Sequence, residues 1–244
     1  MTILVKTAVL REAQPAVAAS LMDVEGVYAE QAGFLEPACL PGARMRLQMA
    51  GGEFCGNAAM SLAAYLARED NLTAGEVPLE VSGADGIVRC RVRARDGAYF
   101  CALDMPLPAT RETVSGYPVM RLPGIAHAIV EDADVDAPAL VRQIADALNA
   151  DAAGVILFSR ERMEIKPLVY VPAARSLVWE HGCGSGTAAV GAYLALERGG
   201  TVRAALRQLG GVITVKAACE CGEITALEIE GRVKIVAEGI AYPE

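Results

Sequence analysis

Two cysteines in this sequence stand in matching surroundings, each followed at once by small residues. The two motifs are Cys55-Gly56-Asn57 and Cys183-Gly184-Ser185. Each cysteine precedes a stretch rich in Ala and Leu, which predicts a helix that begins at the cysteine. The free amides and the dipole at a helix N-terminus favour a thiolate, so we expect a lowered thiol pKa at both positions.

The same helix starts suit one kind of chemistry. Amides that glycines leave unobstructed can hold a carboxylate or an oxyanion. If two such helix ends face one bound molecule, one thiolate can take a proton from one side of a carbon while the other thiol delivers a proton to the opposite side. This two-base exchange would invert the α-carbon of an amino acid, and it requires neither a metal nor an organic cofactor.

An internal repeat contains both motifs. Without gaps, residues 55–69 (CGNAAMSLAAYLARE) align with residues 183–197 (CGSGTAAVGAYLALE), with seven identities in fifteen positions. The offset is 128 residues, about half of the chain, and β-rich sequence follows each copy. A repeat on this scale indicates a duplicated structural unit. We place the two halves at residues 1–113 and 114–244, linked around residues 110–118, and the last strand could return to the first half.

The elements around the motifs predict an α+β fold. Apolar residues occur on every face of the two repeated helices, and a helix of this kind must be buried. The following strands alternate: in residues 86–94, Val88 and Cys90 face one way while Arg89 and Arg91 face the other. We therefore expect two pseudo-symmetric halves, each a curled β-sheet or barrel around a central buried helix. Residues 136–150 predict an ordinary surface helix capped by Asp136.

Composition excludes several other classes. The 22 basic and 30 acidic residues give a net charge of −8 without a basic cluster, which argues against nucleic-acid binding. The longest stretch without Asp, Glu, Lys or Arg, residues 181–196, is too short and too rich in glycine for a membrane span. Because Arg11 and Glu12 interrupt the apolar N-terminal run, no signal peptide is expected. We expect a cytoplasmic protein.

The other cysteines suggest neither a disulfide framework nor a metal site. The total of seven is odd, the spacing is scattered, and no CxxC pair is present. Cys219 and Cys221 lack a second ligand pair of suitable spacing, and the chain has only two histidines. We expect no metal and no cofactor. No residue pattern fixes the oligomeric state, although the chain could form a homodimer.

The segments GGEFCGNAA and EHGCGSGTAA resemble the motifs of the cofactor-independent amino-acid racemases and epimerases with the diaminopimelate epimerase fold. That group includes proline racemases and the histidine racemases of opine-type metallophore pathways. The resemblance covers the whole chain in architecture, because the family also has two similar halves with a cysteine-bearing central helix in each. In sequence it is specific around the two motifs.

The resemblance implies roles for individual residues. Cys55 and Cys183 would be the two acid/base thiols. A histidine that precedes an apolar strand in the family corresponds to His127, which would lie near the thiols and the substrate. Glu180, with a different spacing, resembles an acidic residue that family members place near the site, and Glu53 is a similar candidate. The turn residues that would hold the substrate carboxylate are Gly56, Asn57, Gly184 and Ser185.

Departures from the family pattern bear on the substrate. Diaminopimelate epimerases begin with a Gly-Asn-Asp-Phe motif that is absent here. Their longer loop before the second cysteine is reduced to residues 179–182, and their Asn-Pro before the site histidine is replaced by Ile125-Ala126. These groups recognise the distal end of diaminopimelate. We therefore expect a smaller free amino acid as substrate, with histidine as the leading candidate.

Other interpretations of the same residues stay open. Cys-Gly could merely begin a helix, His127 could be a satisfied core histidine, and Glu180 could cap a turn. Within the same fold, the enzyme could be a double-bond isomerase or a dehydratase that acts on a small carboxylic acid. In a different functional class, the two thiols could form a redox switch in a binding module, since accessible thiols of low pKa oxidise readily.

Overall fold

The computed structural model describes residues 1–172 and 176–243, which form two compact units. The first unit comprises Met1–Leu103 together with the chain from Gly231 onward, and the second comprises Asp104–Glu230. The boundary lies earlier than the expected division at residues 113 and 114. Residues 110–118, where the sequence suggests a link, contribute to the strands β7 and β8 of the second unit.

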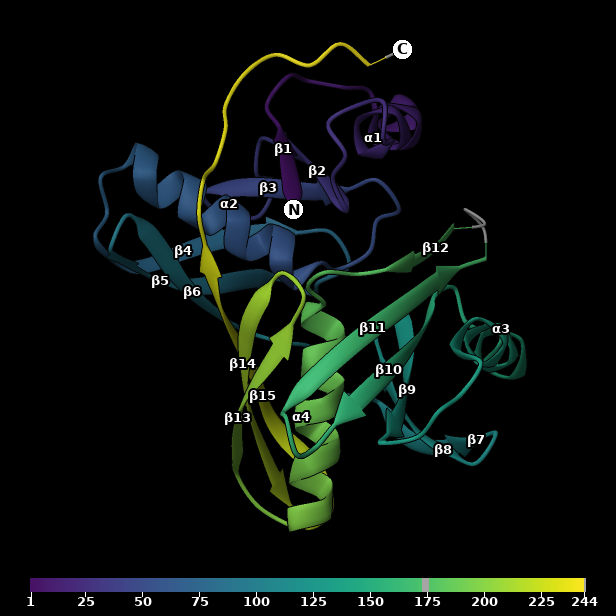
Figure 1. Ribbon diagram of the computed structural model, residues 1–244. Helices are drawn as coiled ribbons and strands as arrows, with labels where there is room; N and C mark the ends of the chain where they lie inside the picture. The colour runs from purple at the N-terminus through teal and green to yellow at the C-terminus, as the bar shows by residue number, and fades with distance from the viewer. Residues whose placement is uncertain (173–175, 244) are drawn as a thin grey trace. The chain divides into compact units, whose positions relative to one another are not determined.

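The first unit is a mixed sheet with the order β1-β2-β3-β4-β5-β6 (Figure 1). The neighbouring pairs β1/β2 and β3/β4 are parallel, whereas β2/β3, β4/β5 and β5/β6 are antiparallel. Its elements are β1 (Thr2–Val5), the 3-10 helix η1 (Arg11–Ala13), α1 (Gln14–Met22), β2 (Gln31–Glu36), β3 (Met45–Met49), α2 (Gly56–Glu69), β4 (Ala74–Val81), β5 (Ile87–Arg95) and β6 (Ala98–Asp104).

The second unit has the order β15-β14-β13-β11-β10-β9-β8-β7, and β12 pairs with β11. Its elements are β7 (Thr110–Val114), β8 (Tyr117–Leu122), β9 (Ile125–Glu131), α3 (Ala137–Leu148), β10 (Ala153–Ser159), β11 (Glu164–Val171), β12 (Ser176–Trp179), α4 (Gly184–Arg198), β13 (Val202–Gln208), β14 (Gly211–Glu220) and β15 (Glu223–Val233). The last strand begins in the second unit, and from Gly231 the chain belongs to the first.

The strand pattern confirms the duplication predicted from the sequence. In the second unit β9/β10 and β11/β13 are parallel, whereas β10/β11 and β13/β14 are antiparallel, which repeats the pattern of β1 to β5. The helices fall at equivalent places: α1 and α3 follow the first strand of each pattern, and α2 and α4 lead into β4 and β13. The two cysteine-bearing helices therefore occupy equivalent positions in two copies of one α+β unit.

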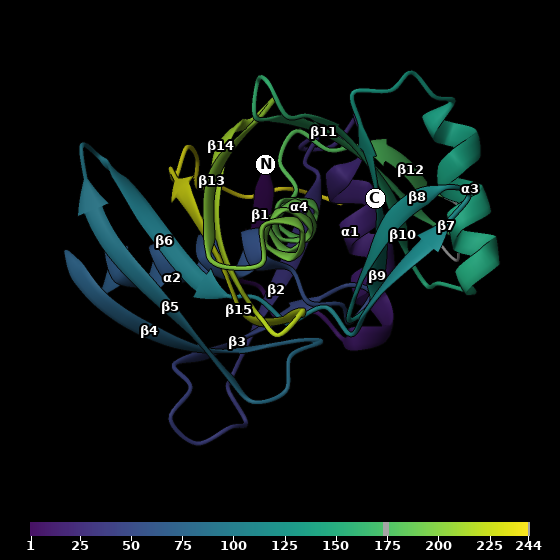
Figure 2. The same cartoon turned by 90° about the horizontal axis from the view of Figure 1, so that it is seen from below.

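Each sheet packs around its cysteine-bearing helix. Helix α4 contacts β13 and β14 on one side and β8, β9 and β10 on the other, and Figure 2 shows it end-on within the arc of these strands. Helix α2 contacts all of the strands from β1 to β5. In α4, every residue from Gly184 to Ala195 is buried except Ser185, which is half-buried. In α2, Asn57, Ser61 and Tyr65 form a half-buried stripe.

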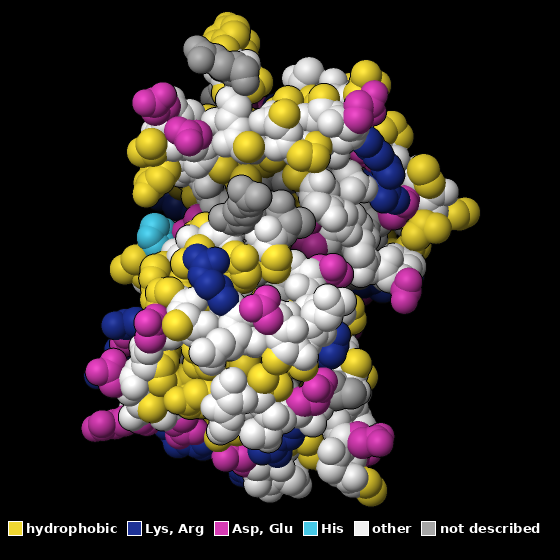
Figure 3. All heavy atoms as spheres, turned by 90° about the vertical axis from the view of Figure 1, so that its right-hand side faces the viewer, with side chains coloured by type: hydrophobic (Ala, Val, Ile, Leu, Met, Phe, Trp, Pro, Cys, Tyr) yellow, Lys and Arg dark blue, Asp and Glu magenta, His cyan; other side chains and the backbone are white. Residues whose placement is uncertain are grey.

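The local features predicted for the surface helix are also confirmed. Helix α3 begins after Asp136, whose carboxylate accepts a hydrogen bond from the Ala139 amide at 3.0 Å. Its apolar face packs on the β9–β11 region through Leu140, Val141 and Ile144. In the part of the chain that the structure describes, no helix is long and apolar enough to cross a membrane. On the face drawn in Figure 3, Lys and Arg side chains lie among Asp and Glu side chains.

Candidate active site

Both motif cysteines cap their helices with sulfur. Cys55 is the N-cap of α2 with φ −125° and ψ 106°, and Cys183 is the N-cap of α4 with φ −117° and ψ 110°. The Ala58 amide donates to Sγ of Cys55 at 3.5 Å, and the Gly186 amide donates to Sγ of Cys183 at 3.2 Å. The sulfur atoms therefore take the place that serine or aspartate oxygens usually occupy at a helix start.

The turn residues predicted to hold a carboxylate occupy the first two positions of each helix. Gly56 and Asn57 begin α2, and Gly184 and Ser185 begin α4. In the second unit the first backbone bond of the helix runs from the Thr187 amide to the Cys183 carbonyl. The Gly184 and Ser185 amides precede that bond, so they belong to the group of N-terminal N–H donors that a helix cannot satisfy internally.

Cys55 lies in a half-buried position in the first unit. Its thiol donates to Oε1 of Gln31 on β2 at 3.4 Å, and the Thr2 hydroxyl donates to the same oxygen at 3.1 Å. Ahead of the motif, the Ser82 hydroxyl donates to the Glu53 carbonyl at 2.9 Å and accepts from the Met49 amide at 3.0 Å. Ser82 therefore fixes the loop that delivers Cys55 to its helix.

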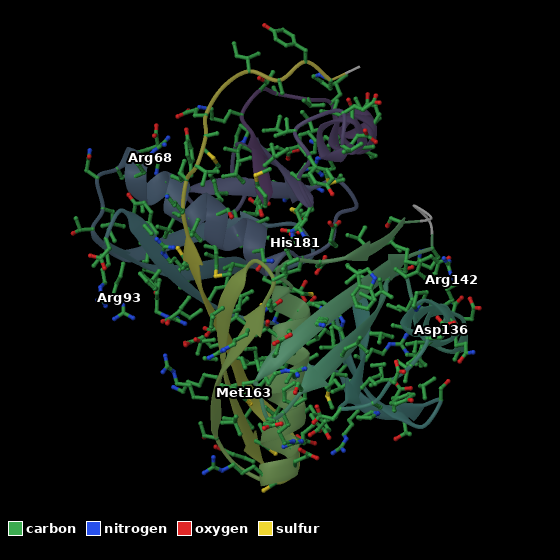
Figure 4. All side chains as sticks on the ribbon, viewed as in Figure 1. Arg68, Arg93, Asp136, Arg142, Met163 and His181 are labelled. Carbon is green, nitrogen blue, oxygen red and sulfur yellow. The ribbon has the colours of Figure 1, made fainter. Side chains whose placement is uncertain are left out.

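Cys183 lies deeper, with 3% of its surface exposed. Its Sγ is 3.4 Å from Oγ of Ser185, and its backbone amide donates to Oε1 of Gln208 at 2.7 Å. The preceding loop is held through His181, whose carbonyl accepts from the Gly210 amide at 2.6 Å. Figure 4 labels His181 at the loop that leads into α4.

Burial reverses the pKa shift expected for Cys183. It raises the pKa of the Cys183 thiol well above the ordinary value, and the charge of Glu180 and a hydrogen bond with its carboxylate raise the pKa further. Hydrogen bonds from Ser185 and the Gly186 amide lower the pKa, but by less. The prediction of a lowered pKa from the helix start alone is therefore wrong here, because desolvation disfavours the charged thiolate. Glu180 lies beside this thiol.

His127 lies behind Ser185. The ring on β9 is fully buried, and its Nε2 is 2.9 Å from Oγ of Ser185. Nδ1 has no hydrogen-bond partner in residues 1–172 and 176–243. Burial lowers the pKa of His127 to about 3, so the ring is neutral at physiological pH. The structure thus places His127 one side chain away from the Cys183 sulfur.

Three residues around Cys183 were not singled out from the sequence. Gln208 and Thr187 hydrogen-bond to the Cys183 backbone, and Gly154 makes room for His127, because a Cβ there would overlap the imidazole ring. The sequence does contain a pattern that could have identified Gln208. The alternation of β13 puts it in the same inward-facing row as the buried Ala204 and Leu206, where a polar side chain needs a partner.

Comparison with known proteins gives a consistent result. The family model described as the histidine racemase CntK N-terminal domain matches residues 1–242. A histidine racemase of Staphylococcus aureus is 32% identical, covering 100% of this chain and 94% of its own length. A histidine racemase of Fusobacterium nucleatum is 31% identical, covering 93% of this chain and 87% of its own length.

Solved structures share the fold. A protein described as a predicted epimerase from Pseudomonas aeruginosa has a TM-score of 0.67 at 17% identity, covering 97% of this chain and 90% of its own. A probable proline racemase from Agrobacterium radiobacter, with the same coverage, has a TM-score of 0.62 at 14% identity. A phenazine biosynthesis protein of the PhzF family from Bacillus anthracis has a TM-score of 0.64 at 15% identity, covering 89% of this chain and 86% of its own. The fold class expected from the sequence is confirmed.

Proposed function

This chain belongs to the family of the histidine racemase CntK N-terminal domain, and from that premise we propose that it interconverts the L and D enantiomers of free histidine. The protein is an isomerase of the racemase and epimerase class. The observation that carries the histidine assignment is the 32% identity to the S. aureus histidine racemase, which extends over the entire chain. The sequence departures from diaminopimelate epimerases favour the same small substrate.

We assign the proton transfers to Cys55 and Cys183. One thiolate removes the α-proton and becomes a thiol, while the electron pair of the broken C–H bond stays on the α-carbon. The other thiol gives its proton to the opposite face of that carbon and becomes a thiolate. The reverse reaction exchanges the two roles, so each thiol serves as the base for one enantiomer.

The matched helix starts support this assignment. Each thiol caps a helix whose first two residues carry N–H donors at the positive end of the helix dipole. Such donors can hold the substrate carboxylate and the negative charge that develops on it when the α-proton leaves. Gly56 and Gly184, which have no side chain to obstruct the approach, are the residues that we expect to come nearest to the carboxylate.

The surroundings of Cys183 suggest its state in the resting enzyme. Because burial and Glu180 raise its pKa, Cys183 is the better candidate for the protonated thiol. The two-base scheme then requires Cys55 to be the thiolate, so Cys55 must first lose the proton that it donates to Gln31. Once Cys183 has given up its proton, the Ser185 hydroxyl at 3.4 Å can donate to the sulfur and stabilise the charge.

His127 acts through Ser185 in this scheme. If the neutral ring carries its hydrogen on Nε2, that hydrogen is donated to Oγ of Ser185, and the serine hydrogen is then directed toward the Cys183 sulfur. A ring with a pKa of about 3 is a weak base near neutral pH, and its Nε2 is engaged by Ser185. We therefore assign His127 as a positioning residue and Glu180 as a charge that tunes the Cys183 thiol.

A reducing compartment suits an enzyme that needs two free thiols. All seven cysteines are free in the structure, and a disulfide between Cys55 and Cys183 would consume both proton carriers. We accordingly place the enzyme in the cytoplasm. The homodimer stays a prediction, which light scattering of the purified protein would check.

A substrate survey tests the proposed function. The reduced protein is incubated in turn with histidine, proline, glutamate, alanine and diaminopimelate, and each mixture is resolved by chiral chromatography. We expect the opposite enantiomer to accumulate for histidine and to reach an equal mixture. Inversion of another amino acid but not of histidine would overturn the substrate assignment. No inversion of any of them, with both thiols shown to be reduced, would favour a double-bond isomerase or a redox module.

A further inference from the structure

A closed ring of hydrogen bonds surrounds the backbone of Cys183. Oε1 of Gln208 accepts from the Cys183 amide at 2.7 Å, and Nε2 of Gln208 donates to Oγ1 of Thr187 at 2.8 Å. The Thr187 hydroxyl in turn donates to the Cys183 carbonyl at 2.7 Å. All three residues are buried, with 8% of Gln208, 0% of Thr187 and 3% of Cys183 exposed. We call this set the Gln208 clamp.

The clamp fixes both peptide groups that flank the Cα atom of Cys183. One end of the glutamine amide holds the N–H on the side of the preceding loop, and the other end holds the C=O through Thr187. With both peptide planes held, the direction of the Cα–Cβ bond is fixed. The Gly186 amide then completes the restraint on Sγ itself. Restraint of this kind matters for proton transfer because small displacements of a reacting atom lower the rate steeply.

The fold does not require this clamp. In the first unit, the residues 128 positions earlier than Gln208 and Thr187 are Glu80 and Ala59. Glu80 accepts from the Cys39 and Leu40 amides, at 2.7 and 3.0 Å, and pairs with Arg46, so it serves a different loop. An alanine at position 59 has no hydroxyl to offer. The same helix start therefore forms in the first unit without the clamp.

We infer that Gln208, acting through Thr187, is a positioning residue that aims the Cys183 sulfur for its proton transfer. The inference rests on the proposed function, since it assigns Gln208 to one of the two thiols of that reaction. Loss of the clamp slows the step in which Cys183 takes or gives a proton and leaves the step at Cys55 unchanged.

Two substitutions break the clamp, and a third is the matched control. Gln208→Leu removes both amide contacts, whereas Thr187→Val keeps the shape of the side chain and removes only the hydroxyl. Gln48→Leu removes another glutamine of equal exposure, 8%, whose amide contacts Arg46 and the Met49 carbonyl. We expect kcat/KM to fall about 10- to 100-fold in Gln208→Leu, less in Thr187→Val, and little in Gln48→Leu.

The α-deuterium isotope effect distinguishes positioning from a general structural defect. The effect on kcat/KM is measured for both enantiomers of α-deuterated histidine. In the clamp variants we expect the isotope effect to rise for the enantiomer whose α-proton Cys183 removes, because removal of that proton then limits the rate more strongly. For the other enantiomer it should fall, because delivery of a solvent-derived proton by Cys183 becomes limiting. A defect that only lowers the fraction of active enzyme leaves both effects as in the wild type.

A second readout needs no substrate. Alkylation of Cys183 and Cys55 by iodoacetamide is followed by peptide mass spectrometry, with Cys55 as the internal reference. We expect Cys183 to react several-fold faster in Gln208→Leu and Thr187→Val, while the Cys55 rate stays constant. If alkylation rates and isotope effects both match those of the wild type, the inference is overturned. If the wild type racemises no histidine but the clamp variants expose Cys183, the proposed function fails and the structural role of the clamp stands.

Discussion

The starts of α2 and α4 are two versions of one structural device. Both helices begin with a cysteine in extended conformation whose sulfur accepts the amide three residues on. In each loop, the carbonyl of the residue two positions before the cysteine accepts a hydrogen bond. The Ser82 hydroxyl donates to the Glu53 carbonyl, and the Gly210 amide donates to the His181 carbonyl. These anchors are themselves 128 residues apart, like the cysteines. The duplication therefore preserves the support of each thiol as well as its position.

The surroundings of the two sulfur atoms differ. Cys55 is half-buried and has the Gln31 amide oxygen as a partner. Cys183 is almost fully buried beside Ser185 and Glu180, and its backbone is enclosed by Gln208 and Thr187. A helix start of this kind therefore does not by itself give a thiol of low pKa, as the raised pKa of Cys183 shows. A helix N-terminus favours a thiolate, but the depth of the site and the nearest charge determine whether that preference prevails.

The largest predicted effect tests whether both members of the pair are needed. Cys55→Ser and Cys183→Ser should each lower the rate of histidine racemisation by about 10³-fold or more, because a serine hydroxyl is too weak an acid to carry the proton. The rate is measured by circular dichroism of the histidine enantiomers, with Cys39→Ser as the control at an exposed cysteine. Either active-site variant with more than a tenth of wild-type activity would contradict the two-thiol scheme.

The second prediction concerns the packing behind Cys183. In Gly154→Ala the new Cβ must displace the His127 ring, which is fully buried. We expect the free energy of unfolding to fall by about 1–3 kcal/mol and activity to fall with it. Denaturant titration measures the loss, and Gly200→Ala, whose Cβ would meet no atom within 4 Å, is the control. Equal stability of the two variants would show that His127 is not held as described.

Ser185→Ala should have a moderate effect confined to the surroundings of Cys183. The substitution removes a hydroxyl that lies between Cys183 and His127 and lowers the pKa of the Cys183 thiol. We expect the pKa of Cys183 to rise and kcat to fall about tenfold, with a pH profile displaced toward higher pH. Ser61→Ala in α2, where the hydroxyl donates to the Asn57 carbonyl, is the control. An unchanged profile would remove Ser185 from the scheme.

The last prediction is a pH dependence of stability that originates at His127. Its pKa is lowered to about 3 in the folded protein, so below its ordinary pKa of about 6.5 only the unfolded chain takes up the proton. Stability should therefore decrease as the pH falls from about 6 toward 4, by up to about 1.4 kcal/mol per pH unit. His127→Gln should flatten this decrease, whereas exposed His181→Gln should not. Parallel curves for His127→Gln and the wild type would contradict a neutral buried ring.

The sequence predicted the features that repeat. The duplication, the α+β class and the two cysteine-headed helices followed from the motif at Cys55 and Cys183, because helix starts and strand alternation are encoded locally. The cap of α3 at Asp136 was equally local. The division of the chain between Leu103 and Asp104 was not encoded in this way, because it depends on which strands pack together.

The chemical environment of each thiol was harder to predict. The raised pKa of Cys183 arises from burial and from Glu180, neither of which a helix-start motif specifies. Gln208 is 25 residues from Cys183 in the chain and reaches it only because β13 packs beside the start of α4. Gly154 matters because the parallel register places it opposite His127. Contacts of this kind depend on tertiary pairing rather than on local pattern.

The most direct test of the two-thiol account measures how much deuterium from the solvent enters the α-carbon of histidine in the first turnovers. The reduced enzyme is incubated with L-histidine in deuterium oxide, and proton NMR with chiral separation measures the label at the α-carbon of each enantiomer. We expect the D-histidine formed to carry deuterium from the outset, because the second thiol delivers a solvent-derived proton. The remaining L-histidine should stay unlabelled at early times. D-Histidine that retains its original protium would show that a single base moves the proton, and it would contradict the assignment of Cys55 and Cys183 as an acid/base pair.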